Sequence, residues 1–264
     1  MKIGICGICG RMGLAILDVV LEKGHTLAAA FDVPENPNFG KDVSQINSKC
    51  PPGIKVVTIN KSVLSQCDCI IDFSSHKAAM ELLRISTDSK TPLVIGTTGF
   101  SEDDKNEIHK AAEILPIVWS PSMSVGVNIL FKITEIAAKA LSSDYDVEIF
   151  EAHHKFKKDA PSGTANKLYD IVRSSMPGMA DAKAVYGREG FTGERTKKEI
   201  GVMAMRASDI VGEHTVFMAG PGERLELTAR STNRATYATG SVLAAEFLLG
   251  KNPKLYSMFD VLGL

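Results

Sequence analysis

The sequence has almost no excess of charge, because its 30 lysine and arginine residues nearly balance its 31 aspartate and glutamate residues. A balance this close gives no general attraction to nucleic acid. The sequence also lacks an apolar run of membrane-spanning length, and its first residues lack the layout of a signal peptide. We therefore expect a globular, cytoplasmic protein that binds neither nucleic acid nor a membrane.

Cysteine is scarce as well: there are five, all among the first seventy residues. An odd number cannot pair completely, and without an export signal reduced thiols are expected. Cys6 and Cys9 have the spacing of a redox pair. They lie, however, at a strand end and in a glycine turn, where they are part of a predicted binding loop. No histidine stands at zinc-finger spacing from the cysteines, so we expect no metal site.

Hydrophobic residues make up 44% of the 264 positions and charged residues 23%, so the chain can bury a large core without crosslinks. Over about the first hundred residues, short apolar runs alternate with helical stretches. That order is typical of a doubly wound parallel sheet with helices on both faces. The expected strands are residues 2–6, 27–31, 54–59, 69–73 and 93–95, and the expected helices are residues 12–22, 77–85 and 102–114.

The pattern changes after residue 125, which indicates a second domain of the α+β class. The expected helices cover residues 127–141 and 235–249, and a third follows the polar stretch 153–164 and ends near residue 173. The expected strands are residues 146–151 and, in antiparallel arrangement, 201–206, 213–218 and 224–230. Gly220-Pro221-Gly222 predicts the turn between the last two strands. Residues 187–199 are rich in glycine and charge and predict a surface loop.

A glycine-rich turn follows the first strand and opens the first helix. It reads Gly7-Ile8-Cys9-Gly10-Arg11-Met12-Gly13, with Cys9 where glycine is commonest. Glycines there allow a tight turn and let backbone N–H groups approach a pyrophosphate at the helix N-terminus. Asp32 ends the second strand, where a carboxylate can accept hydrogen bonds from an adenosine ribose. This context predicts a nicotinamide dinucleotide site, and the alternative is an ordinary glycine turn beside a solvated aspartate.

Asp32 also bears on the choice of cofactor. Its carboxylate repels a 2′-phosphate, no lysine or arginine follows until Lys41, and Arg11 is the only nearby cation. A charge-assisted hydrogen bond such as one from the ribose to this carboxylate contributes about 1.5–3 kcal/mol, and a 2′-phosphate would remove it. We therefore expect a preference for NADH of about ten- to a hundredfold, with NADPH as a second possible cofactor.

Two further loops end strands at the same edge of the predicted sheet. Gly96-Thr97-Thr98-Gly99 follows one strand, and Asp72-Phe73-Ser74 ends another. In an open parallel sheet, loops at the carboxyl ends of strands form the ligand crevice. Small and hydroxyl-bearing residues in these loops therefore support a binding site at this edge.

Residues 151–165 combine two histidines, three lysines and the start of a helix. The Pro-Ser-Gly-Thr sequence at 161–164 predicts a capped helix start whose free N–H groups can bind a carboxylate. Histidine can donate a proton near neutral pH, and lysine adds positive charge. The segment therefore predicts a site for a small anionic substrate and a proton transfer; the alternative is a solvated basic loop. Adjacent strand residues point to opposite faces, so His153 and His154 do not predict a metal site.

Taken together, these motifs resemble the dihydrodipicolinate reductase (4-hydroxy-tetrahydrodipicolinate reductase) family of bacterial lysine and diaminopimelate biosynthesis. The resemblance covers essentially the whole chain. Besides the glycine turn and the two loops, it rests on Ser124-Val-Gly-Val-Asn128, Glu151-Ala-His153-His154, Lys157-x-Asp159-Ala-Pro-Ser-Gly163-Thr164 and Arg206-x-x-Asp209-Ile-Val-Gly212-Glu213-His214. The His–Lys–Gly–Thr segment is the most specific of these motifs, and the glycine turn is the least specific.

The resemblance implies the reduction of a small cyclic dicarboxylate by a nicotinamide cofactor. It implies that His153 and Lys157 transfer protons, and that the substrate is held by His154, Ser162, Gly163 and Thr164. The implied cofactor residues are Gly7, Ile8, Cys9, Gly10, Arg11, Met12, Asp32, Gly96, Thr97, Thr98, Ser120, Pro121, Ser122 and Met123. The family usually has Asn in place of Ser122, and the shorter side chain weakens the expected contact with the nicotinamide end.

The resemblance also implies a domain organisation. Residues 1–124 with 235–264 would form a Rossmann-type cofactor domain. Residues 125–234 would form an α+β domain with a mixed, largely antiparallel sheet, which binds substrate and assembles four chains into a homotetramer.

Three other functions fit parts of the sequence. A different two-domain nicotinamide oxidoreductase explains the glycine turn, but it does not predict Lys157 followed by the helix start at 161–164. A catalytically silent NAD-binding regulator would have lost proton-transfer residues, whereas His153 and Lys157 are both present. A nucleic-acid-binding module disagrees with the neutral charge balance and the single tryptophan.

Overall fold

The computed structural model describes residues 1–142 and 144–264 and divides the chain into two compact units. The first unit comprises Met1–Val125 and Arg234–Leu264, and the second comprises Gly126–Asn233. Within the described residues, no helix combines the length and the apolar character that crossing a membrane requires.

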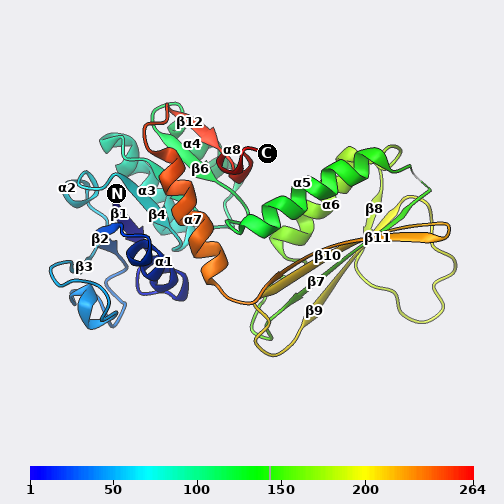
Figure 1. Cartoon of the computed structure of the whole chain (residues 1–264), viewed down its shortest axis with the longest axis horizontal. Helices are drawn as coiled ribbons and strands as arrows, with labels where there is room; N and C mark the ends of the chain where they lie inside the picture. The colour runs from blue at the N-terminus through cyan, green and yellow to red at the C-terminus, as the bar shows by residue number, and fades with distance from the viewer. Residues whose placement is uncertain (143) are drawn as a thin grey trace. The chain divides into compact units, whose positions relative to one another are not determined.

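The first unit is built on a seven-stranded sheet in which all neighbouring strands are parallel (Figure 1). The strand order is β12-β6-β5-β4-β1-β2-β3, so the direction of winding reverses between β1 and β4. The bounds are β1 Lys2–Cys6, β2 Thr26–Phe31, β3 Val56–Val57, β4 Cys69–Asp72, β5 Leu93–Ile95, β6 Pro116–Trp119 and β12 Lys254–Tyr256. Open α/β sheets bind ligands at the carboxyl ends of the strands at such a reversal.

Helices cover both faces of this sheet. Helices α1 and α7 contact each other on one face, and α3 and α4 contact each other on the other. The bounds are α1 Arg11–Glu22, a 3-10 turn Val43–Gln45, α2 Lys61–Leu64, α3 His76–Ser89, α4 Glu102–Ala111, α7 Ala235–Leu248 and α8 Met258–Leu262. Ile3 and Ile5 enter the core on the α1 side, whereas Cys6 enters the core on the α3 side. Burial on both faces explains why these strands read as almost continuous apolar runs.

Most elements predicted for this unit are present, and a few differ. The strands at 2–6 and 93–95 have the predicted bounds, and α4 begins after its cap Ser101, next to the predicted start at residue 102. The predicted strand at 54–59 is shorter in the structure: only Val56 and Val57 pair with β2, at Ala30 and Phe31. The short strands β6 and β12 were not predicted; within the part of the chain that the structure describes, β12 pairs with β6 alone.

The second unit contains a five-stranded sheet in the order β11-β10-β7-β9-β8. The bounds are β7 Asp146–His153, β8 Lys183–Val185, β9 Glu199–Arg206, β10 Gly212–Gly220 and β11 Glu223–Ser231. β10 is antiparallel to β7 and β11, but β9 is parallel to β7 and β8. The expectation of a largely antiparallel sheet is therefore wrong for β9. Alternation identifies which residues share a face, but it does not show that β7 lies between the consecutive strands β9 and β10.

Two long helices belong to this unit: α5 Val125–Ala140, apart from its first residue, and α6 Gly163–Ser175. Helix α6 contacts β7, β9 and β10, so it covers one face of the sheet. The Ser162 side chain accepts the N–H of Ala165 at 3.2 Å and caps α6, as the sequence predicts.

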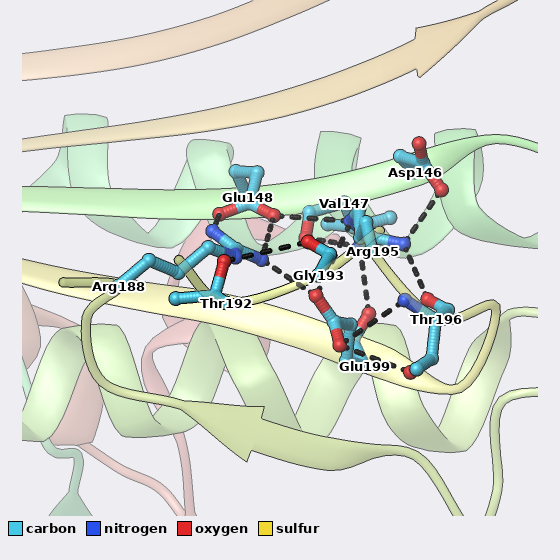
Figure 2. Close-up of polar contacts among 9 residues, drawn as sticks. All are labelled: Asp146, Val147, Glu148, Arg188, Thr192, Gly193, Arg195, Thr196 and Glu199. Atoms are coloured by element: carbon cyan, nitrogen blue, oxygen red, sulfur yellow. Dashed lines mark hydrogen bonds and ion pairs between the residues drawn. The ribbon is translucent and has the colours of Figure 1, made fainter. Parts of the chain in front are cut away.

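The long loop between β8 and β9 is tied to the sheet by ion pairs (Figure 2). Arg188 donates to the carboxylates of Glu148 and Glu199, and Arg195 donates to those of Glu148 and Asp146. Glu148 and Glu151 are three residues apart on β7, so they lie on opposite faces of the sheet. The ion-pair network is therefore separate from the groups around Glu151.

Candidate active site

The glycine turn is a tight backbone loop between β1 and α1. The N–H of Gly7 donates to the carbonyl of Phe31 at 2.9 Å, and the N–H of Gly10 donates to the carbonyl of Gly7 at 3.0 Å. Gly7 has a φ of +79°, and a Cβ there would lie 2.5 Å from the carbonyl oxygen of Phe73. Glycine is therefore required at this position. Helix α1 begins at Arg11 after Gly10, which has no side chain to cap it, so the first N–H groups remain available to an anion.

Asp32 follows β2 and contacts the same turn. Its Oδ2 accepts the N–H of Cys9 and its Oδ1 accepts the N–H of Val33, each at 2.9 Å. Burial and the negative charge of Asp32 raise the pKa of Cys9 to about 12. A thiol that is protonated at neutral pH is a poor nucleophile, so the raised pKa argues against a redox pair with Cys6. All five cysteines are free thiols.

A pocket of about 440 Å³ opens beside the turn, at the carboxyl ends of β1, β2, β3 and β4. Its lining includes three of the predicted cofactor residues, Gly7, Gly10 and Asp32. Thr58 and Ala78 also line it, although the sequence did not single them out. Of the other predicted turn residues, Ile8 is buried in the core, Arg11 is exposed, and Cys9 and Met12 are half-buried.

The loops after β4 and β5 are joined to each other. The N–H of Ser74 donates to Thr97 Oγ1 at 3.1 Å, and the Ser74 hydroxyl donates to Asp72 Oδ1 at 2.5 Å. Asp72 is fully buried, and this burial raises its pKa. A Cβ on Gly96 would overlap the ring of Phe73, so the two loops fit together only with glycine there. Thr98 is exposed at the end of this edge.

The predicted segment Ser120–Met123 follows β6, the neighbour of β5. Ser120 Oγ donates to the carbonyl of Ser122 at 2.9 Å, and Ser122 Oγ accepts the N–H of Ser124 at 3.3 Å. Met123 is buried in the core and Pro121 is exposed. The fold thus brings all four predicted cofactor segments to the carboxyl edge of one sheet, while the pocket itself lies at the β1–β4 side.

In the second unit, three neighbouring strands bring titratable side chains together. His153 ends β7 opposite Arg206 of β9, and Glu151 of β7 lies opposite His214 of β10. Alternate residues of a strand share a face, so Glu151 and His153 point to the same side. Helix α6, which begins after Ser162, packs against these three strands.

Glu151 is fully buried and accepts four hydrogen bonds. Its Oε2 accepts from Arg206 Nη1 at 2.8 Å and lies 2.5 Å from His153 Nδ1. Its Oε1 accepts from Arg206 Nη2 at 2.8 Å and from the N–H of Ser162 at 3.0 Å. Burial by itself raises the pKa of Glu151, but the hydrogen bonds from His153 and Arg206 outweigh it and lower the pKa to about 2. The carboxylate is therefore ionised at neutral pH.

His214 lies on the other side of His153. The two imidazole rings meet edge to face, with centroids 5.2 Å apart, and His214 Nε2 lies 3.0 Å from Ser162 Oγ. Burial, together with the electrostatic influence of the nearby His153, lowers the pKa of His214 to about 3. His214 is therefore neutral at pH 7, and it adds no charge to the site.

Lys157 and His154 lie on the turn that follows β7. Lys157 Nζ donates to both carboxylate oxygens of Asp159, at 2.9 and 2.8 Å. The N–H of Lys157 donates to the carbonyl of His154 at 3.1 Å, which closes the turn. Burial opposes ionisation of Asp159, but the hydrogen bonds from Lys157 lower its pKa. Gly163 and Thr164 are the first two residues of α6, and their N–H groups have no acceptor inside the helix.

Four residues of this cluster were not predicted as site residues: Glu151, Asp159, Arg206 and His214. The sequence held one signal for them, because all four stand in the motifs that carry the family resemblance, although no task was assigned to them there. Arg206 on β9 and His214 on β10 stand more than fifty positions from Glu151. No group of three or more metal-binding side chains occurs within residues 1–142 and 144–264.

Comparison with known proteins matches both parts of the chain to one family. The family model described as "Dihydrodipicolinate reductase, N-terminus" matches residues 1–123, and the one described as "Dihydrodipicolinate reductase, C-terminus" matches residues 126–262. The chain belongs to the dihydrodipicolinate reductase family. The family and the fold class expected from the sequence are thereby confirmed.

Individual relatives of this family align over the full length. The 4-hydroxy-tetrahydrodipicolinate reductase of Ralstonia pickettii is 47% identical over 100% of both chains. That of Aromatoleum aromaticum is 44% identical over 100% of this chain and 96% of the relative. The solved structure of dipicolinate-bound dihydrodipicolinate reductase from Paenisporosarcina sp. TG-14 superposes with a TM-score of 0.76 over 98% of both chains. At 23% identity, that likeness supports the fold alone.

Proposed function

We propose that the chain reduces 4-hydroxy-tetrahydrodipicolinate (dihydrodipicolinate) to tetrahydrodipicolinate in lysine and diaminopimelate biosynthesis, with a reduced nicotinamide cofactor. The observation that carries the proposal is the buried Glu151–His153 pair beside the helix start at Ser162. This arrangement joins a proton donor to N–H groups and lysine charge that suit a dicarboxylate. Relatives at 44% and 47% identity bear the name 4-hydroxy-tetrahydrodipicolinate reductase.

The first unit would bind the cofactor in the pocket beside the glycine turn. Gly7 and Gly10 leave room for a pyrophosphate, and the first N–H groups of α1 would bind its oxygens. Asp32 retains carboxylate lone pairs that can accept ribose hydroxyls, and this favours NADH over NADPH. When bound, the reduced nicotinamide supplies the hydride.

The second unit would bind the substrate and supply the proton. His153 would donate a proton to the carbon next to the one that receives the hydride, and Lys157 would balance negative charge that develops there. His154, Ser162 and the N–H groups of Gly163 and Thr164 would hold the substrate carboxylates. A substrate carboxylate would compete with Asp159 for Lys157, because their ion pair is only partly buried.

We also propose that four chains assemble through the second unit's sheet. Helix α6 covers one face of that sheet. Phe150, Met203 and Phe217 lie on the other face, where they are only half-buried, and Met205 beside them is 40% exposed. Apolar side chains gathered on an open sheet face are typical of a contact between subunits.

A coupled assay tests the proposed reaction. A dihydrodipicolinate synthase would form the unstable substrate from pyruvate and aspartate semialdehyde, while absorbance reports NADH oxidation. We expect oxidation that requires the synthase and that is lost in the double variant His153→Ala, Lys157→Ala. If the folded chain binds cofactor but oxidises neither NADH nor NADPH in this mixture, the proposal is wrong.

A further inference from the structure

All acceptor positions of the Glu151 carboxylate are used by groups that surround His153. Each carboxylate oxygen accepts two hydrogen bonds, and three of the four come from other parts of the chain, Arg206 and Ser162. A carboxylate offers about four such positions, so this one has none left for a substrate. The Glu151 carboxylate therefore has no acceptor position free for the reacting molecule.

Arg206 is itself held in one orientation. Besides its two bonds to Glu151, its Nη1 donates to the carbonyl of Met205 and its Nη2 donates to the carbonyl of Asp159, both at 2.7 Å. The paired guanidinium and carboxylate form the two-pronged contact that lysine cannot reproduce. The Glu151 side chain is 0% exposed, so loss of Arg206 would leave a buried charge uncompensated.

We propose that Glu151, fixed by Arg206, is the positioning residue for proton transfer by His153. It keeps a hydrogen on Nδ1, so that Nε2 is the nitrogen that delivers the proton to the substrate. This inference rests on the proposed function, because it assigns a task within that reaction.

The chemistry of the pair requires this assignment. An ionised carboxylate has no hydrogen to donate, so the atom 2.5 Å from Glu151 Oε2 must carry one, and that atom is His153 Nδ1. The hydrogen bond at one ring nitrogen decides which nitrogen exchanges protons. Arg206 balances the charge of Glu151, so the carboxylate orients the imidazole without adding a net negative charge near an anionic substrate.

Other charged groups near His153 are separate from this assignment. His214 from β10 faces the ring and is neutral at pH 7. Lys157 and Asp159, on the turn after β7, form their own ion pair. Helix α6 contributes the backbone N–H of its cap, Ser162. Among the described residues, Glu151 is the side chain that bonds to the His153 ring.

The variant Glu151→Gln tests the proposal. It keeps the size of the side chain but removes the charge, and its amide places N–H donors against Arg206. We expect kcat to fall by about 10²–10⁴-fold with little change in KM, the range for a misplaced general acid. The kcat–pH profile should change as well, because a negative charge beside the proton donor is gone.

Two further variants separate positioning from folding. Arg206→Lys keeps the charge but not the two-pronged contact, so we expect a smaller loss of kcat in the same direction. Glu148→Gln is the matched control, because Glu148 lies on the same strand and binds two arginines on the opposite face (Figure 2). We expect it to leave kcat and the pH profile unchanged.

Nitrogen-15 NMR of histidine-labelled protein gives a readout that does not depend on turnover. The neutral His153 ring should carry its hydrogen on Nδ1 in the wild type and lose this preference in Glu151→Gln. If the wild type shows no reductase activity, the proposed function fails while NMR still decides the tautomer. If the wild type is active and Glu151→Gln keeps its kcat, pH profile and tautomer, the positioning role is wrong. Should Glu151→Gln not fold, the kcat of Arg206→Lys and the His153 tautomer in the wild-type spectrum test the positioning role instead. An unchanged kcat in Arg206→Lys together with no hydrogen on Nδ1 in the wild type would contradict it.

Discussion

His214 Nε2 lies 3.0 Å from Ser162 Oγ, although 52 positions separate the two residues in the sequence. Ser162 is also the cap of α6, since its hydroxyl accepts the N–H of Ala165. The contact therefore ties the start of the helix to strand β10. Because His214 is 2% exposed, this link between helix and sheet depends on an imidazole that stays neutral.

The low pKa of His214 predicts a loss of stability in mild acid. Its pKa is lowered from 6.5 to about 3, so below pH 6.5 the unfolded chain binds a proton that the folded chain does not. Stability supplied by the neutral ring is complete above pH 6.5 and is lost as the pH falls toward 3. One such proton changes the free energy of unfolding by about 1.4 kcal/mol per pH unit. Urea unfolding at pH 7 and pH 5, followed by circular dichroism, measures this loss.

The variant His214→Gln should make that loss shallower by about 2 kcal/mol between pH 6.5 and 5. Glutamine keeps a polar group near Ser162 but takes up no proton. Glu151 does not contribute to the loss of stability between pH 6.5 and 5. Because its pKa is lowered from 4.5 to about 2, the stability that its ionised form supplies is lost only below about pH 4.5. His109→Gln, at an exposed position of α4, is the control and should retain the wild-type slope. Equal slopes in His214→Gln and the wild type would show that His214 is not the group responsible.

The local elements of the fold could be predicted because their causes are local. β1 and β5 have the predicted bounds because short apolar runs end at a glycine turn or a loop, and α4 and α6 begin at Ser101 and Ser162, which cap them. The order of strands in the second sheet could not be predicted in this way. The pairing of β9 with β7 depends on which surfaces pack together, and no property of residues 199–206 specifies it.

In the candidate site too, the residues that are close in sequence could be predicted, and those brought in by strand pairing could not. His153, Lys157 and the helix start at Ser162 stand within one short segment, so their spacing alone indicated a shared task. Arg206 and His214 come from two other strands, and an arginine on a strand ordinarily predicts a solvated position. They join the site because β7 lies between β9 and β10, which only the pairing of the strands reveals.

Asp32 predicts the cofactor preference. We expect kcat/KM for NADH to exceed that for NADPH by about ten- to a hundredfold, because the carboxylate accepts ribose hydroxyls and repels a 2′-phosphate. Asp32→Asn should bring the ratio closer to one, since its amide oxygen can still accept the N–H of Cys9 while the charge is lost. Asp18→Asn removes a carboxylate that bonds Lys49 on the surface, and it should leave the ratio unchanged. A wild-type preference for NADPH would contradict the ribose assignment.

Assembly should depend on the open face of the second sheet. Light scattering should give a mass of four chains for the wild type and a smaller mass for Phe217→Glu, because a charge cannot be buried in an apolar contact. Leu225→Glu is the control: Leu225 is 40% exposed on β11, and its pairing with Met218 turns it to the other face. A four-chain mass for Phe217→Glu would move the contact to another surface.

His153→Ala should separate catalysis from cofactor binding. Removal of a general acid lowers kcat by about 10²–10⁴-fold. The affinity for NADH, measured by fluorescence titration, should stay near the wild-type value, because the proposed cofactor pocket is lined entirely by residues of the first unit. Lys157→Ala should also lower kcat, whereas Lys158→Ala, at the exposed neighbouring position, should not. An unchanged kcat in His153→Ala would remove His153 from the mechanism, and the function assigned to Glu151 with it, since Glu151 reaches the substrate only through that imidazole.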